Sequence, residues 1–293
     1  MSSETARRLA RRWVFPAVES AWAAGASLVG RTLRADPASW TAASGARVLV
    51  VAAHPDDETL GAGGTIAGHV AAGDHVAVAV VTDGSASRAP GVDPDTIASR
   101  RRQEAEAAAA ILGVERLVCL GLVERHWDAR EARQLLEPLL AEAAIVYVPP
   151  IVDFHPEHVA VSRVVAELLA QRQLVRMYEL GVPLTPVLAN CVTDTIAFAE
   201  LKARALDAYV TQRLSTAPYA RLERYRALLY GLDAAEVFWQ LPADAFARVT
   251  ALGDWRDRRT PFRGIRPRPF TDPLAAIVGL KQRLALRRAA LDG

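Results

Sequence analysis

The sequence predicts an α/β fold: a Rossmann-like, doubly wound and mostly parallel sheet flanked by helices. Short apolar runs rich in β-branched residues, such as residues 48–53 (VLVVAA), are typical of buried parallel strands. These runs alternate with longer helical stretches, which implies βαβ units with right-handed crossovers. No internal repeat competes with this interpretation. A helical N-terminal extension and a mainly helical C-terminal part complete the predicted architecture.

The elements follow from apolar periodicity and from the residues that end each run. The expected strands are residues 48–53, 75–81, 116–120, 144–148 and 174–179. The expected helices in this part of the chain are residues 59–72, 95–112, 128–143 and 156–171. Asp95 is expected to cap the second of these helices, and Gly113 is expected to end it. Further along, helices are expected at residues 198–210 and 219–229.

Composition places the chain among ordinary globular proteins. Of 293 residues, 51% are hydrophobic and 23% are charged, which excludes a disordered or fibrous chain. The formal net charge of +2 is too small for a protein that coats nucleic acid, so no nucleic-acid partner is expected. Two cysteines cannot form a disulfide framework. We therefore expect a protein of a reducing compartment, the cytoplasm.

The two ends of the chain differ from the middle. Residues 1–46 form an extension in which four arginines precede an apolar stretch at residues 13–30, interrupted by Pro16 and Glu19. A spanning helix needs about 20 apolar residues, so we expect this segment either to pack on the domain or to lie on a membrane surface. Residues 246–293 are expected to form a basic tail with a final helix. Six arginines lie between residues 254 and 270, which favours a surface segment, with polyanion binding as the alternative.

Two polar clusters directly follow predicted strands. The first is AHPDDE at residues 53–58, and the second is DFHPEH at residues 153–158. If the strands are ordered 3-2-1-4-5, the first and fourth strands are neighbours at a topological switch point, where ligands bind beyond the carboxyl ends of strands. The two clusters would then face each other across one crevice. Imidazole and carboxylate ligands without thiolate suit zinc or another divalent first-row metal.

Each cluster has a simpler interpretation when it is taken alone. An aspartate after a strand is often a helix cap, and Pro156 suits the first position of a helix. Both clusters at one switch point favour the metal site, because burying several ionisable groups is costly. Consecutive residues in an extended turn point to opposite sides, so Asp56 and Asp57 are expected to do different jobs. His155 and His158 are three residues apart at the start of a helix and therefore share a face.

The clusters resemble those of the PIG-L/LmbE-like zinc-dependent N-acetylglucosaminyl deacetylases. AHPDDE followed by GAGG carries the likeness, and HPEH at residues 155–158 is similar to the HPDH of that family. Supporting similarities are listed here in chain order: residues 82–84 (TDG), Arg101 with Glu104, residues 112–113 (LG), Lys202 with Gln212, and residues 235–238 (AEVF). The resemblance covers roughly residues 47–240, and we expect the domain itself to span residues 47–245.

The resemblance implies a role for each matching position. His54, Asp57 and His158 would be the zinc ligands, and Asp56 the general base that takes a proton from a zinc-bound water. His155 would stabilise the developing oxyanion and help to protonate the leaving amine. Arg88 and Glu157 would contact substrate, Arg88 from the turn after residues 82–84. Glu157 stands where the family usually has Asp. If that carboxylate orients His155, its extra methylene could shift His155 or force a different partner, such as Asp153.

These roles imply a metal-dependent hydrolase that removes an N-acetyl or N-acyl group from an N-acetylglucosamine-type conjugate, a small molecule. The alternatives are a zinc amidase acting on a non-sugar or thiol-conjugate amide, and a glycan-binding module without activity. Asp56 is intact, which argues against the inactive module. A dinucleotide site is excluded because the GAGG stretch lacks GxGxxG spacing and a pyrophosphate would meet three carboxylates.

Overall fold

The computed structural model describes residue 24 and residues 45–86, 92–184, 187–212, 223, 226–252 and 280–291. Most of the N-terminal extension, Arg88 and the arginine-rich segment 254–270 lie outside these described residues. Within the described ranges, no helix combines the length and the apolar character that a membrane crossing requires.

A mixed, mostly parallel sheet of seven strands forms the centre of the described structure, in the order β3-β2-β1-β4-β5-β7-β6. The strands are β1 Arg47–Ala52, β2 His75–Thr82, β3 Arg116–Leu122, β4 Ile145–Val148, β5 Leu174–Tyr178, β6 Cys191–Asp194 and β7 Ala235–Pro242. Strands β1 to β5 are parallel, and β1 pairs with both β2 and β4. The predicted fold class and the predicted order 3-2-1-4-5 are confirmed.

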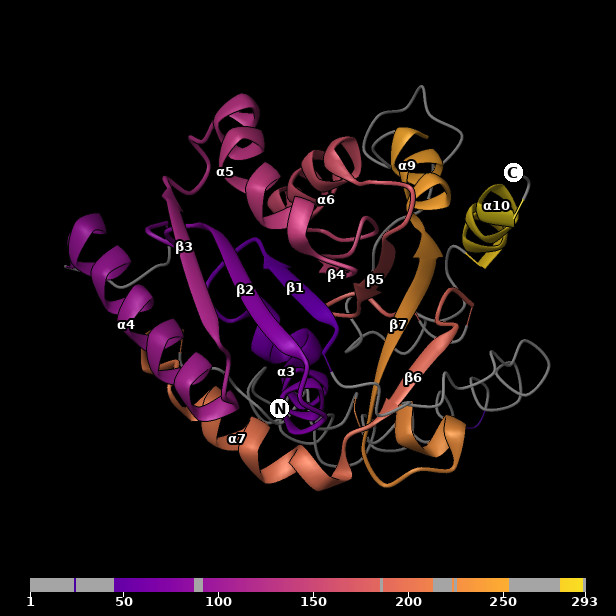
Figure 1. Ribbon diagram of the computed structural model, residues 1–293, viewed down its shortest axis with the longest axis horizontal. Coiled ribbons are helices and arrows are strands. Elements are labelled where there is room, and N and C mark those ends of the chain that lie inside the picture. Colours follow the sequence, from indigo (N-terminus) through magenta and orange to yellow (C-terminus); the bar gives the residue numbers. More distant parts are fainter. Residues whose placement is uncertain are drawn as a thin grey trace, which may run out of the picture.

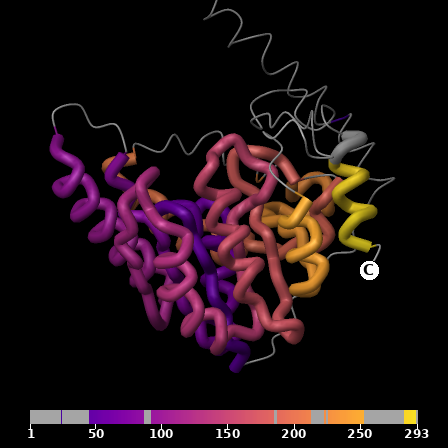
Figure 2. Tube along the Cα trace, turned by 90° about the horizontal axis from the view of Figure 1, so that it is seen from above, coloured from indigo at the N-terminus to yellow at the C-terminus, as the bar shows by residue number. Residues whose placement is uncertain are grey.

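Helices cover both faces of the sheet (Figure 1). On one face lie α3 Asp57–Ala71, α4 Pro94–Leu112 and α7 Ala199–Asp207, and on the other lie α5 Ala129–Glu142, α6 Pro156–Leu168, α9 Ala243–Ala251 and α10 Leu280–Leu291. Short 3₁₀ turns, Ile196–Phe198 and Val210–Gln212, flank α7. Figure 2 shows the early strands and helices at one end of the molecule, and β7, α9 and α10 at the other.

The sequence analysis missed β6 and β7. Both strands are antiparallel to their neighbours: β7 pairs with β5, and β6 pairs with β7. β7 does have the sequence signal of a strand, because its sequence AEVFWQLP places the aromatic residues Phe238 and Trp239 in a buried apolar run. β6 has only four residues, too few for a clear pattern. The C-terminal part is therefore less helical than expected, and the sheet is mixed.

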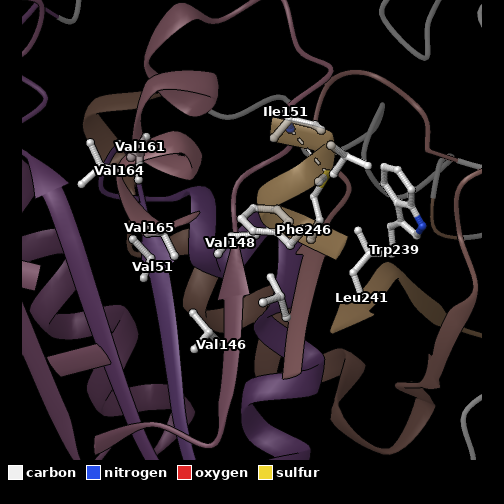
Figure 3. Packing of buried hydrophobic residues seen from close by; sticks show 14 of the residues in the cluster. Val51, Val146, Val148, Ile151, Val161, Val164, Val165, Trp239, Leu241 and Phe246 are labelled. Carbon is white, nitrogen blue, oxygen red and sulfur yellow. Dashed lines mark hydrogen bonds between the residues drawn. The ribbon is translucent and has the colours of Figure 1, made fainter. Parts of the chain in front are cut away.

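The central strands are buried on both faces, as their unbroken apolar sequences predict. Figure 3 shows Val51 and Val146 from the sheet packed with Val161 and Val165 of α6. Phe246 of α9 lies in the same cluster. Burying a side chain of this size contributes about 1.5–3 kcal/mol to stability. The core thus fixes the sheet, and with it the loops that leave the strand ends.

Helix ends agree with the predictions in one case and correct them in another. Gly113 ends α4 in the left-handed region at φ 77, where glycine is favoured. The N-cap of α4 is Asp93 and not Asp95: its carboxylate accepts a hydrogen bond from the Thr96 backbone N–H at 2.9 Å. Pro94 occupies the first helical position, as proline commonly does.

The predicted domain boundary after residue 245 lies within helix α9. The final helix α10 packs on α9, and its Leu286 and Ala290 belong to the same buried cluster as Phe246. Residues 280–291 are thus helical and join the described core.

Candidate functional site

The two polar clusters meet beyond the carboxyl ends of β1 and β4. These strands are adjacent, with Val50 opposite Tyr147, and each leads into one cluster. The ring centroids of His54 and His155 are 4.4 Å apart, and those of His54 and His158 are 5.3 Å apart. The convergence expected from the topological switch point is therefore present.

A strained backbone separates the two neighbouring aspartates. Asp56 has φ 125, a conformation that costs a non-glycine residue about 1–3 kcal/mol. Asp57 opens helix α3 and directs its Oδ2 to His54 Nδ1 at 3.2 Å and to His158 Nε2 at 3.3 Å. Asp56 instead lies beside Arg101, with 3.3 Å between Oδ2 and Nη2. The two carboxylates thus face different partners, as the sequence predicts.

Asp57 contacts two buried imidazoles and contributes to a raised pKa in each. Burial disfavours the charged form of His54, but hydrogen bonds with Asp57 and Glu157 outweigh it and raise its pKa to about 9. Burial opposes the charge on His158 too, yet Asp57 and Asp153 raise its pKa to about 10. Despite burial, the two histidines hold the pKa of Asp57 well below its usual range. Asp57 is therefore shared by two cationic rings, and Glu157 and Asp153 each add a second carboxylate to one of them.

The contacts of Asp57 with the two histidines have the spacing expected of neighbouring metal ligands. A tetrahedral zinc with bonds of about 2.0–2.1 Å places neighbouring ligand atoms about 3.3 Å apart. Asp57 Oδ2 lies 3.2 Å from His54 Nδ1 and 3.3 Å from His158 Nε2, which matches that spacing. Two imidazoles and a carboxylate are also the ligand types that zinc prefers in sites that keep an open position. A metal would bind as the rings lose their protons.

His155 belongs to two sets of side chains that could hold a metal ion. Ligand atoms of His54, His155 and His158 lie within 4.8 Å of one another, and so do those of His54, Glu124, His155 and Glu157. The His155 ring is half-buried, and its Nδ1 is buried without a hydrogen-bond partner among the described residues. Burial and the two neighbouring histidines lower the pKa of His155 to about 4. This ring is therefore a neutral group beside the ligand set.

Asp56 is buried in the same crevice with an acidic neighbour. Burial raises the pKa of Asp56 to about 7, although Arg101 opposes that rise. Arg101 also donates to the Pro55 carbonyl at 2.5 Å, and Glu58 accepts from the Asp56 backbone N–H at 3.2 Å. Tyr209 donates to Glu58 in turn. These contacts hold the strained turn and give Asp56 a pKa suited to a general base.

The structure gives Glu157 partners within the protein. Its carboxylate lies 2.8 Å from His54 Nε2 and accepts hydrogen bonds from the Arg125 backbone N–H at 2.7 Å and from Trp127 Nε1 at 2.8 Å. The expected role in contacting substrate stays a prediction, and so does that of Arg88, which lies outside the described residues.

Sequence analysis gave no site role to Glu124 or Arg101. Glu124 follows β3, its Oε1 lies 4.0 Å from His54 Nε2, and its Oε2 accepts from the Ala86 backbone N–H at 3.0 Å. A carboxylate just beyond a strand end is the signal that identified both other clusters. Arg101 lies in the middle of α4, far along the chain from any strand end. Only the packing of that helix brings its side chain to Asp56.

Most of these groups line a cavity of about 360 Å³ together with apolar residues. Arg125 and Gln212 add to its polar lining, and its apolar lining is Leu60, Ala86, Leu180, Gly181 and Phe154. Phe154 is 50% exposed, and its ring lies so close to Gly181 that a Cβ atom there would come within 2.8 Å of it. The cavity can therefore hold a small molecule with both polar and apolar faces.

Part of the chain is similar in sequence to a known family and to curated deacetylases. Residues 49–169 match the family model described as PIG-L: GlcNAc-PI de-N-acetylase. A 1D-myo-inositol 2-acetamido-2-deoxy-alpha-D-glucopyranoside deacetylase of Mycobacterium sp. (strain KMS) is 38% identical over 132 residues, which cover 40% of this chain and 42% of that protein. The diacetylchitobiose deacetylase of Thermococcus kodakarensis is 33% identical over 119 residues, 38% of this chain and 45% of that protein. The chain thus matches less than half the length of these two curated relatives.

Solved structures share the fold. The N,N'-diacetylchitobiose deacetylase from Pyrococcus horikoshii superposes with a TM-score of 0.61 at 21% identity, covering 68% of this chain and 85% of that one. A conserved protein from Thermus thermophilus has a TM-score of 0.56 at 27% identity, covering 67% of this chain and 94% of that one. The seven-stranded mixed sheet of the described residues therefore belongs to a fold that these proteins share.

Proposed function

Since the chain is a member of the PIG-L/LmbE-like family, we propose that it is a metal-dependent hydrolase that removes the N-acetyl group from an N-acetylglucosamine-type conjugate. The observation that carries the proposal is the division between Asp57 and Asp56. Asp57 lies between His54 and His158 at ligand spacing, whereas Asp56 lies beside that set in the same cavity. A hydrolytic metal site needs both arrangements: ligands, and a free base within reach of the attacking water.

The metal ligands in this proposal are His54, Asp57 and His158. A divalent ion held there supplies a Lewis acid that lowers the pKa of water and polarises the amide carbonyl. Three protein ligands leave a further position open, which is typical of catalytic zinc sites. Zinc is the metal that this ligand set favours, and another divalent first-row ion would be the substitute.

Asp56 accepts the proton of the attacking water. As the water oxygen bonds to the acetyl carbon, the carbonyl π electrons move to the carbonyl oxygen, and the proton passes to Asp56. Asp56 then returns that proton to the amide nitrogen as the carbon–nitrogen bond breaks, so that acetate and a free amine leave. Arg101 keeps the carboxylate in place through its contact at 3.3 Å.

His155 stabilises the negative charge that develops on the carbonyl oxygen. It lines the cavity, its ring lies 4.9 Å from that of His158, and its Nδ1 makes no hydrogen bond with any described residue. A positioned N–H at such a site is worth about 10²–10³ in turnover. The apolar wall at Phe154 and Leu180 would accept the less polar face of a sugar ring.

The proposed substrate class rests on the names of the relatives. The two described above specify N-acetylglucosamine joined to inositol or to a second sugar, and a probable N-acetyl-alpha-D-glucosaminyl L-malate deacetylase 2 of Bacillus anthracis, 29% identical over 133 residues, specifies malate. We assign this chain the shared part, the N-acetylglucosamine unit. The test is acetate release by the zinc-loaded protein from these three conjugates and from free N-acetylglucosamine. Release from at least one conjugate supports the proposal, and none from any of them refutes it.

Metal content provides the second arm of the test. His158→Ala should lose the bound metal and the activity together, because it removes one of three ligands. His75→Ala is the matched control, since the His75 side chain is 61% exposed at the opposite end of β2 and pairs with surface Glu115. Equal metal content in His158→Ala and in His75→Ala would show that the ligands are wrongly assigned.

A further inference from the structure

The carboxylate of Glu157 lies on the far side of His54 from the proposed metal position. His54 Nδ1 faces Asp57 Oδ2 at 3.2 Å, and His54 Nε2 faces Glu157 Oε2 at 2.8 Å. A neutral imidazole carries one proton on its two nitrogens. Both carboxylates only accept hydrogen bonds, but a metal held by Asp57 and His158 would need the lone pair of Nδ1, which leaves the single ring proton on Nε2, facing Glu157. The lone pair is then on Nδ1, on the side of Asp57 and His158.

Glu157 is itself held in place by donors that leave one oxygen for His54. Its Oε1 accepts hydrogen bonds from the Arg125 backbone N–H at 2.7 Å and from Trp127 Nε1 at 2.8 Å. Both donors belong to the loop between β3 and α5, so that loop fixes the carboxylate. Glu157 also lies in the first turn of α6, where the helix dipole favours negative charge. The Glu157 carboxylate is therefore held in place by the protein itself, before a metal binds.

We propose that Glu157 is a positioning residue that fixes His54 in the Nε2–H tautomer, so that Nδ1 binds the metal. This inference rests on the function proposed above. Metal-binding histidines generally donate their second ring N–H to a carboxylate, a carbonyl or water, and removing that partner typically weakens metal binding about 10–100-fold. In this proposal Glu157 contacts the metal ligand His54, and not the substrate as the sequence analysis expects.

His158 has a similar but looser arrangement of contacts. His158 Nε2 lies 3.3 Å from Asp57 Oδ2, and its Nδ1 lies 3.3 Å from Asp153 Oδ2. Both rings thus lie between the shared Asp57 and a second carboxylate. The distance to Glu157 is the shorter of the two outer contacts, which makes His54 the ring whose tautomer is most strongly set.

The experiment measures zinc affinity of the full chain by competition with a chelator. Glu157→Gln keeps the shape but offers a single acceptor oxygen, so it cannot serve His54 and the two N–H donors together. We expect its zinc dissociation constant to rise about 10–100-fold. Trp127→Phe removes one donor to Glu157 and should weaken zinc binding in the same direction, by less.

Glu236→Gln is the matched control. Glu236 is also a buried glutamate that accepts from two backbone N–H groups, those of Gly64 and Thr65, yet none of its described contacts is with a proposed ligand. Its variant should unfold more easily and keep the zinc affinity of the wild type. Loss of affinity in both glutamate variants would mean that the effect is general destabilisation, and would overturn the proposal.

The tautomer itself is visible in the ¹⁵N NMR spectrum of the zinc-loaded protein. We expect the His54 signals to show a protonated Nε2 and a metal-bound Nδ1, with faster exchange of the Nε2 proton in Glu157→Gln. Metal on Nε2, or an unchanged zinc affinity in Glu157→Gln, would overturn the proposal. A wild-type protein that binds no zinc would instead refute the proposed function, so the two failures are distinguishable.

Discussion

Gly61, in the second turn of α3, packs against the ring of Tyr178 on β5. A Cβ atom at position 61 would lie 2.8 Å from Tyr178 Cγ and closer still to Cδ2, at least 0.6 Å inside the 3.4 Å where ordinary contacts begin. The ring cannot easily move, because Tyr178 is fully buried and its hydroxyl donates to the Val51 carbonyl at 3.0 Å. Gly61→Ala must therefore displace the helix that begins with Asp57.

The cost can be isolated by comparison with Gly63→Ala in the same helix. There the nearest atom is Lys202 Cγ at 3.1 Å, a contact that a shift of a few tenths of an ångström relieves. Both substitutions gain about 0.8–1.0 kcal/mol of helix propensity, while overpacking at Gly61 costs about 1–3 kcal/mol. We expect Gly61→Ala to be less stable than Gly63→Ala by about 1–3 kcal/mol in urea unfolding. Equal stabilities would refute the argument that this glycine is required by close packing.

Two further predictions concern pH and substrate binding. Burial lowers the pKa of His69, which lies 2.9 Å from Tyr147 Oη, so the folded protein binds fewer protons there than the unfolded chain. The free energy of unfolding should therefore decrease as the pH falls below 6.5, the ordinary pKa of histidine. The decrease between about pH 8 and about pH 5 should be smaller in His69→Gln than in the wild type. Equal decreases in the two proteins would contradict this prediction. Phe154→Ala should raise KM for acetate release about two- to tenfold with little change in kcat, because its half-exposed ring lines the cavity and has no group that can transfer a proton. A fall in kcat at constant KM would show that Phe154 acts on the reacting groups.

The parallel half of the fold was predictable because each of its strands has a local signal. Val48–Ala52 and Val76–Val81 are buried on both faces, and sequences of that kind have few alternatives to a parallel sheet. In the antiparallel part, β7 has a local signal in Phe238 and Trp239, but β6 has only four residues, and its pairing with a segment about 40 residues further along the chain leaves little trace in a pattern of apolar residues.

The site was predictable to the extent that its residues lie next to strand ends. His54 and His158 follow from topology alone, since adjacent parallel strands bring their loops together. The division between Asp56 and Asp57 was also expected, but not its cause, the positive φ of Asp56. The partner of Glu157 could not be predicted, because it depends on the loop that carries Trp127 and on which side of His54 that loop lies.

The most direct test of the central claim is the turnover of Asp56→Ala at known metal content. Asp56 is proposed to transfer the proton, and His54, Asp57 and His158 are proposed to bind the metal. The variant should therefore bind as much zinc as the wild type and release acetate from an N-acetylglucosamine conjugate about 10²–10⁴-fold more slowly. Near-normal turnover, or a variant purified without its zinc, would contradict this division of labour.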